Sequence, residues 1–219
     1  MHVLAVDTAT GRGSVAVVGP DGLLAEARVA AAAGHSSWLL SAAEALLRGL
    51  GLAPSAVDAF AVTTGPGSFT GLRVGLSSVQ GLGLASGRPC VGLSTLDVLA
   101  FAAGGGVAVV ALMDAYRGEL YSAVYDASGS LCRRAGLSGL AAALEGVPAG
   151  ARFVGDAVGR EREAIAATVP GAVFPDLDLY LAAPLGRAAL GCVARGEAIP
   201  ASQLRPLYLR GAVVRTASP

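Results

Sequence analysis

The sequence predicts an α/β protein of two lobes, each of which opens with three short strands and continues into helices. Near the start, "HVLAVD", "GSVAVVG" and "GLLAEARVA" are typical of strands, and "TATGR" and "PDG" between them supply turn residues. Further along, "VAVVALMDA" repeats the strand that ends in aspartate, and "GELYSAVYD" and "LCRRAGL" complete a second three-strand meander. The repeated order indicates an internal duplication, with an N-terminal lobe over residues 1–103 and a C-terminal lobe over residues 104–219 that begins at a run of three glycines.

Helices and further strands follow each meander. Residues 35–50 have apolar side chains at helical spacing, with Ser36 or Ser37 as a candidate cap. "VDAFAVTT" predicts a strand, residues 72–86 a helix, "RPCVGLS" a strand and "TLDVLAFAA" a helix. After the second meander we expect a short helix, the strand "ARFVGD", the helix "GREREAIAATV" and a long helix over residues 180–195.

Composition limits the classes of function. The chain has 219 residues, 53% of them hydrophobic and 15% charged, which is enough to bury a full core. Its net charge is zero, so no global field favours nucleic acid, and Arg205, Arg210 and Arg215 are either a solvated tail or a small local patch. No apolar run is long enough to span a membrane, and the first residues lack the basic start of a signal peptide, so we expect a cytoplasmic protein with no membrane association.

A glycine-rich stretch, "TTGPGSFTGLRVG", joins a predicted strand to a predicted helix. Glycine amides and the free N–H groups of a helix N-terminus can hold an anion, so the stretch is a candidate phosphate site together with the end of the first strand. It has neither the G-K-[ST] ending of a Walker loop nor the G-x-G-x-x-G pattern, so the residues alone favour a tight strand-to-helix turn capped by Ser68 or Thr70 over a phosphate site. The candidate nucleotide or anion site comprises Asp7, Thr8, Gly65, Gly67, Ser68, Thr70 and Gly71.

The sequence offers little for metal-dependent or nucleophilic catalysis. Its two histidines are His2 and His35, and the position four residues after His35 is Leu39, which excludes a helical pair of histidine ligands. No serine lies in a G-x-S-x-G motif, and the three cysteines form no C-x-x-C pair. We therefore predict no metal site and no catalytic residues.

Several blocks resemble the TsaB (YeaZ) family. They are "VLAVDTATGRGSVAVV", "GHSSWLLSAAEALL", "VDAFAVTTGPGSFTGLRVGLSSVQGLGLA", "LMDAYRGELYSAVY" and "LRPLYLRG", and together they cover most of the chain. The resemblance implies the actin-like, sugar-kinase-like ATPase fold (ASKHA, related to ribonuclease H), with two duplicated lobes of mixed sheet flanked by helices. The family pattern D-A-R in the second lobe is replaced here by Asp114, Ala115 and Tyr116, with Arg117 one place later.

The same resemblance implies a function in the bacterial machinery that makes threonylcarbamoyladenosine next to the anticodon of tRNA. TsaB-type subunits pair with the metal-containing transferase TsaD, and the ATPase TsaE joins the pair. It implies a non-catalytic subunit that requires no cofactor, has no peptidase activity and contacts tRNA through the complex. Weak ATP or ADP binding stays open, and the alternative is a small-molecule kinase or ATPase of the same fold, which Asp7 and the glycine-rich stretch suggest.

For such a subunit, two helices are the expected partner surface. The helix over residues 35–50 is apolar over a wider arc than one sheet face covers, and the next helix carries the small residues Gly75, Ser78 and Gly81. Apolar surface that the fold leaves exposed normally indicates association with another chain. We therefore expect pairing with TsaD, and self-association when the chain is alone. The expected contact residues are His35, Trp38, Leu39, Ala42, Leu46, Arg73, Leu76 and Gln80.

Overall fold

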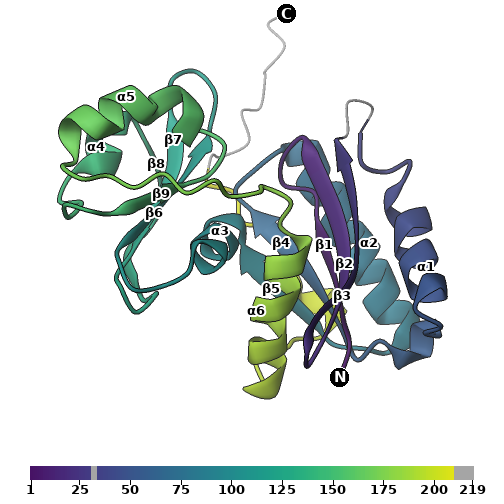
Figure 1. Ribbon diagram of the computed structural model, residues 1–219. Coiled ribbons are helices and arrows are strands. Elements are labelled where there is room, and N and C mark those ends of the chain that lie inside the picture. Colours follow the sequence, from purple (N-terminus) through teal and green to yellow (C-terminus); the bar gives the residue numbers. More distant parts are fainter. Residues whose placement is uncertain (31–33, 210–219) are drawn as a thin grey trace, which may run out of the picture.

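The computed structural model describes residues 1–30 and 34–209, which form two mixed sheets with helix α3 between them (Figure 1). The first sheet has the strand order β3-β2-β1-β4-β5. Its central strand β1 pairs antiparallel with β2 and parallel with β4. The strands of this sheet are β1 (Val3–Asp7), β2 (Arg12–Gly19), β3 (Gly22–Ala30), β4 (Ala59–Gly65) and β5 (Cys90–Ser94).

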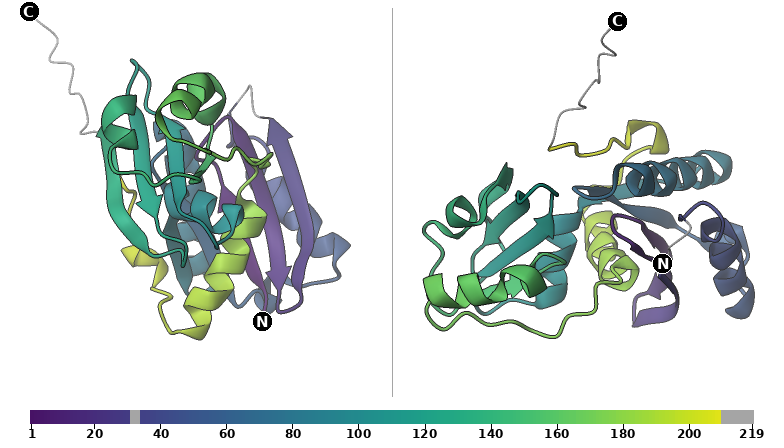
Figure 2. Two further views of the ribbon diagram at one scale, coloured as in Figure 1. Left: turned by 60° about the vertical axis from the view of Figure 1, so that its left-hand side comes forward. Right: turned by 90° about the horizontal axis from the view of Figure 1, so that it is seen from above.

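Helices cover both faces of the first sheet, which explains why every residue of β1 is buried. Figure 2 shows α2 on one side of this sheet and α6 on the other. Helices α1 and α2 share a core with one set of alternating strand residues, and α3 and α6 share a core with the other set. These elements are α1 (Leu39–Gly49), η1 (Pro54–Ala56), α2 (Phe69–Ser86), α3 (Thr95–Ala103), α6 (Ala182–Ala194) and η2 (Ala201–Gln203).

The second sheet repeats the arrangement of the first with the order β8-β7-β6-β9. Its strand β6 pairs antiparallel with β7 and parallel with β9, as β1 does with β2 and β4, and each central strand ends in an aspartate. This repetition confirms the predicted fold class. The elements of this part are β6 (Val109–Asp114), β7 (Leu120–Tyr125), β8 (Leu131–Ser138), α4 (Leu140–Leu144), β9 (Arg152–Val154) and α5 (Val158–Thr168).

Helix α6 lies in the expected C-terminal lobe by its position in the sequence, but it packs on the first sheet rather than on the second (Figure 1). Ser14 Oγ of β2 accepts a hydrogen bond from the Ala182 amide at 3.0 Å, which fixes the start of the helix. Gly186 then allows a close approach, since a Cβ there would lie 2.5 Å from Val18 Cγ2. The helix is also shorter than expected, and residues 182–204 belong with the N-terminal sheet.

The two helices expected to bind a partner begin differently from the prediction. Helix α1 begins at Leu39, and no side chain caps it, so neither Ser36 nor Ser37 has the expected role. Helix α2 begins at Phe69, earlier than predicted, and Ser68 is its N-cap, with Oγ accepting a hydrogen bond from the Gly71 amide.

None of the helices in residues 1–30 and 34–209 is long and apolar enough to span a bilayer.

Candidate functional site

Hydrogen bonds connect the β1–β2 turn to the start of α2 at the carboxyl end of strand β1. Thr8 Oγ1 donates to the Gly71 carbonyl at 2.8 Å, and the Ser68 amide donates to the Ala9 carbonyl at 2.7 Å. The Gly71 amide is bonded to Ser68 Oγ at 3.3 Å. Two of the amides that an anion would need are therefore already bonded within the chain.

The glycines of the motif allow this contact between backbones. A Cβ at Gly67 would lie 2.3 Å from the Ala9 carbonyl oxygen, and one at Gly71 would lie 2.1 Å from the Thr8 carbonyl oxygen. Gly75, one helical turn later, lies against Thr8 Oγ1, where a Cβ would come within 2.3 Å. Gly75 therefore allows packing within the lobe, in contrast to the expected close contact with a partner.

Asp7 lies beneath this junction and is fully buried. Its Oδ1 accepts hydrogen bonds from Thr63 Oγ1 at 2.7 Å and from the Ala9 amide at 3.2 Å, whereas Oδ2 has no partner among the described residues. Burial raises the pKa of Asp7 from 3.8 to about 6, against the opposing effect of the Thr63 hydrogen bond. The carboxyl group thus changes its charge at a pH of about 6.

We expect Asp7 to make the chain less stable as the pH rises from 3.8 to about 6. In that range the folded chain keeps a proton that the unfolded chain has lost, so the free energy of unfolding falls with pH, by about 3 kcal/mol in total. The Asp7→Asn variant should lack this contribution. Urea unfolding of both chains across the range measures the difference, and parallel pH dependences would contradict the assignment.

An open cleft of about 630 Å³ separates the carboxyl ends of the two central strands. Gly67, Ser68, Thr70 and Gly71 line it from the first lobe, whereas Asp7, Thr8 and Gly65 do not reach its wall. From the second lobe come residues that the sequence reasoning did not assign to a site, namely Asp114, Tyr116, Arg117 and Asp156.

The wall that the second lobe contributes carries charged groups of both signs and has an unusual backbone. Asp114 forms an ion pair with Arg160 at 3.1 Å, and its amide donates to Asp156 Oδ1 at 2.9 Å. Tyr116 and Arg117 both have positive φ, 60° and 58°, a conformation that non-glycine residues rarely adopt. Arg117 therefore lines the cleft even though it stands one place later than in the family pattern.

Burial excludes several of the expected partner residues from a direct contact. Leu39 and Leu76 are 1% and 5% exposed and pack towards the sheet. His35 is also buried, and its Nε2 lies 2.8 Å from the Thr10 carbonyl oxygen. Trp38 is half-buried against its own lobe, beside Gly13 and the His35 ring. The expectation that His35, Leu39 and Leu76 contact a partner is therefore corrected.

The other expected partner residues lie at or near the surface. Arg73 is exposed, and its guanidinium stacks on the Phe69 ring at 3.7 Å. Gln80 donates to the Leu204 carbonyl at 3.2 Å, which ties α2 to η2. Ala42 and Leu46 are half-buried on α1.

A groove between α1 and α2 carries apolar side chains that the sequence reasoning missed. Leu40 and Phe69 line a hollow of about 500 Å³ together with Arg73 and Ser77. Leu40 is 54% exposed and Phe69 49%, and Leu84 further along α2 is 65% exposed. We call Leu40, Phe69 and Leu84 the exposed trio. The apolar arc of α1 predicted an apolar face that the sheet does not cover. Only the position of the sheet shows that Leu40, and not Leu39, lies on this exposed face.

Of the C-terminal arginines, Arg205 is exposed and donates to the Ser202 and Leu204 carbonyls at 2.7 Å each. Arg210 and Arg215 lie outside the described residues. Among the residues that the structure describes, no group of three or more His, Cys, Asp and Glu side chains is arranged to hold a metal ion.

Comparison with known proteins identifies the family. The family model described as "TsaD: tRNA N6-adenosine threonylcarbamoyltransferase" matches residues 29–138. The solved structure named "YeaZ from Pseudomonas aeruginosa" has a TM-score of 0.81 and 32% sequence identity, over 94% of this chain and 100% of that one. The chain belongs to the TsaB (YeaZ) family.

A curated relative of this TsaB-family chain shows the extent of the sequence match, and a more distant solved structure shows the fold. The Escherichia coli protein "tRNA threonylcarbamoyladenosine biosynthesis protein TsaB" is 38% identical over 128 residues, which is 57% of this chain and 55% of that protein. The match thus spans about half the length of this curated relative. An ADPNP-bound activator of 2-hydroxyisocaproyl-CoA dehydratase from Clostridium difficile, 10% identical with a TM-score of 0.56 over 95% of this chain and 100% of that one, shares the fold.

Proposed function

We propose that the chain is a non-catalytic subunit of the machinery that forms threonylcarbamoyladenosine in tRNA, where it pairs with a TsaD-type transferase. Its family and the name of the E. coli relative support the pathway. The observation that carries the proposal is the exposure of Leu40 and Phe69, which line a groove between two helices, together with that of Leu84 further along α2. Exposed apolar side chains gathered beside a groove are typical of association surfaces.

The occupant that we propose for this groove is the equivalent helix pair of a TsaD-type subunit. The family model described for TsaD matches the part of this chain that contains α1 and α2, so the two subunits share this region. Related surfaces pack in a similar way, and two copies of this chain would then meet through the same groove as a homodimer. A TsaE-type ATPase joins the pair, and tRNA is reached through the complex in the cytoplasm.

A catalytic role has little support from the residues themselves. His35 is buried and already hydrogen-bonded to the backbone, and Leu39 stands where a second helical histidine would be needed. Two amides of the glycine motif are bonded within the chain. These features favour a supporting subunit over a transferase or a peptidase.

Reconstitution tests this function. Purified TsaD-type and TsaE-type subunits, given the threonylcarbamoyl donor and tRNA, should modify tRNA faster when this chain is added. The rise should reach a plateau when the chain and the TsaD-type subunit are present in equal amounts. A rate that is unaffected by the chain would overturn the proposal.

A second candidate function is that of a small-molecule kinase or ATPase with a nucleotide in the cleft between the lobes. The specific observation in its favour is the cleft of about 630 Å³, which is lined by the turns after both central strands. Weak ATP or ADP binding there is compatible with either function. Turnover of ATP by the isolated chain, abolished in Asp114→Asn at the wall of the cleft, would favour the enzyme, whereas binding without turnover fits the subunit.

A further inference from the structure

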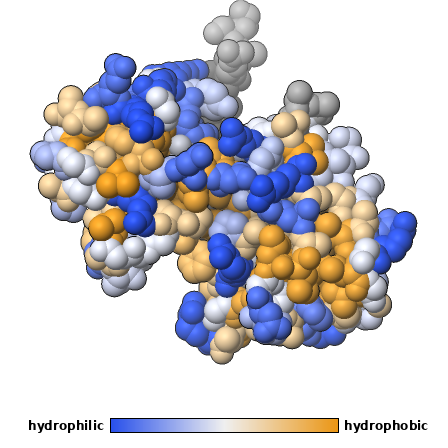
Figure 3. Space-filling model, in the orientation of Figure 1, coloured by the Kyte–Doolittle hydropathy of each residue, from blue (hydrophilic) through white to orange (hydrophobic). Residues whose placement is uncertain are grey.

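A second hollow, of about 700 Å³, lies at the opposite end of the second sheet from the cleft. The hollow and the cleft lie at opposite ends of strand β6. Val109 at the start of the strand lines the hollow, and Asp114 at its end lines the cleft. Its walls come from α3, α6 and the turn between β7 and β8. We call it the lower notch, because the surface is indented there below the junction of the lobes (Figure 3).

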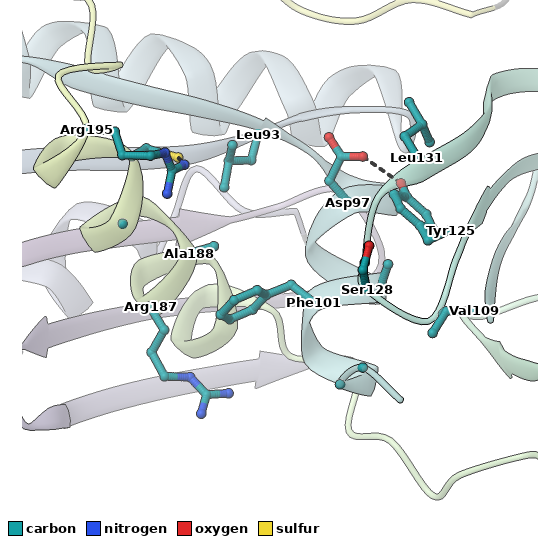
Figure 4. Close-up of a pocket in the computed structure, with 16 residues that line it drawn as sticks. Leu93, Asp97, Phe101, Val109, Tyr125, Ser128, Leu131, Arg187, Ala188 and Arg195 are labelled. Atoms are coloured by element: carbon teal, nitrogen blue, oxygen red, sulfur yellow. Dashed lines mark hydrogen bonds between the residues drawn. The ribbon is translucent and has the colours of Figure 1, made fainter. Parts of the chain in front are cut away.

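The interior of the lower notch is largely apolar. Leu93, Ala100, Ala188 and Cys192 contribute to the walls, and Phe101 projects from α3 towards α6 (Figure 4). Phe101 is 49% exposed, and Leu131 on the opposite wall is 48% exposed. A concave site of several hundred Å³ with apolar walls and a few polar groups has the dimensions of a small-molecule pocket.

Two of the three charged residues that line the notch are paired. Asp97 Oδ1 accepts a hydrogen bond from the Tyr125 hydroxyl at 2.5 Å, as drawn in Figure 4. Burial, together with the Asp97 carboxylate, raises the pKa of Tyr125, so this hydroxyl stays a donor. Arg195 forms two hydrogen bonds of 2.7 Å with Glu197.

Arg187 is different, because it has no acidic partner among the described residues. Its guanidinium lies on the rim, 5.9 Å from the centroid of the Phe101 ring, and points away from Arg195 (Figure 4). The notch therefore combines an exposed aromatic ring with an adjacent positive charge that nothing in the described chain neutralises. A ligand that complements both has an apolar body and one negative group.

We propose that the lower notch binds a small organic anion with a flat aromatic body, which lies against Phe101 and places its charge on Arg187. Such a ligand would touch α6, which packs on the first sheet, and the β7–β8 turn, which extends the second. It would therefore connect the two lobes on the side away from the cleft. Binding to the folded chain alone also predicts a higher thermal midpoint with ligand present.

Two fluorescent probes test the site. Anilinonaphthalene sulfonate has the proposed shape and charge, and phenylnaphthylamine is its counterpart without the sulfonate. We expect Arg187→Gln to weaken binding of the sulfonate about tenfold and to leave the neutral probe unchanged, because one charge-assisted contact is lost. Phe101→Ser should weaken both probes severalfold, and the sulfonate should raise the thermal midpoint of the unaltered chain.

The groove between α1 and α2 is the competing apolar site, so Leu40→Glu is the matched control. It should leave both affinities unchanged. Arg187 is an exposed residue, and circular dichroism should show each variant to be folded. Equal affinity of the sulfonate for the unaltered chain and for Arg187→Gln would overturn the proposal, as would a loss of binding in Leu40→Glu alone.

Discussion

Gly71→Ala is expected to lower the free energy of unfolding by about 3 kcal/mol, because the new methyl group has no space. It would lie 2.1 Å from the Thr8 carbonyl oxygen, which is a backbone atom and cannot rotate away. Helix α2 would have to move from the β1–β2 turn, and the hydrogen bond from Thr8 Oγ1 to the Gly71 carbonyl would be strained. Urea unfolding followed by circular dichroism measures the loss.

Gly81→Ala is the control on the same helix. A Cβ at Gly81 meets no atom within 4 Å, so alanine there should raise the stability by roughly 0.5–1 kcal/mol through its greater helix propensity. The two variants make the same chemical change in one helix and should differ in sign. Equal effects would show that the motif glycines do not serve the close contact with the turn.

Leu39→Glu is expected to unfold the chain, whereas Leu40→Glu should leave it folded. Leu39 is 1% exposed in the core beneath α1, and an unpaired carboxylate there costs more than about 4 kcal/mol. Leu40 is 54% exposed, and Leu40→Glu loses only about 0.3 kcal/mol from its proximity to Glu44. Thermal melts of both variants measure this contrast, and two similar midpoints would contradict the orientation of α1.

Much of the fold follows from local signals in the sequence. Strand β1 reads as a short apolar run that ends at Asp7, and β6 repeats it, so the duplication was predictable from element order. Helix α6 was predictable as a helix but not in its position. Its place on the first sheet depends on contacts between distant segments, such as apolar packing against β1 and β2 and the hydrogen bond between Ala182 and Ser14, which lie 168 positions apart, and no local pattern reports such contacts.

The candidate site was predictable only in part, for the same reason. The glycine motif was visible, but whether its amides face a ligand or the chain depends on the β1–β2 turn, which contributes Thr8 and Ala9 from a distant segment. On α1, the width of the apolar arc predicts an exposed apolar face. Which leucine lies on that face depends on the angle at which the helix meets the sheet. The sequence therefore predicts Leu39 at the surface, where the structure has Leu40 instead.

Pairing with a TsaD-type subunit should depend on the groove between α1 and α2, and sedimentation measures it. In sedimentation experiments with equal amounts of the two proteins, the unaltered chain should form a one-to-one complex, and so should Val173→Glu, which alters a 46% exposed apolar residue of the second lobe. Leu40→Glu should stay folded and sediment separately from its partner. A Leu40→Glu chain that pairs as well as the unaltered one would contradict the assignment of the groove between α1 and α2.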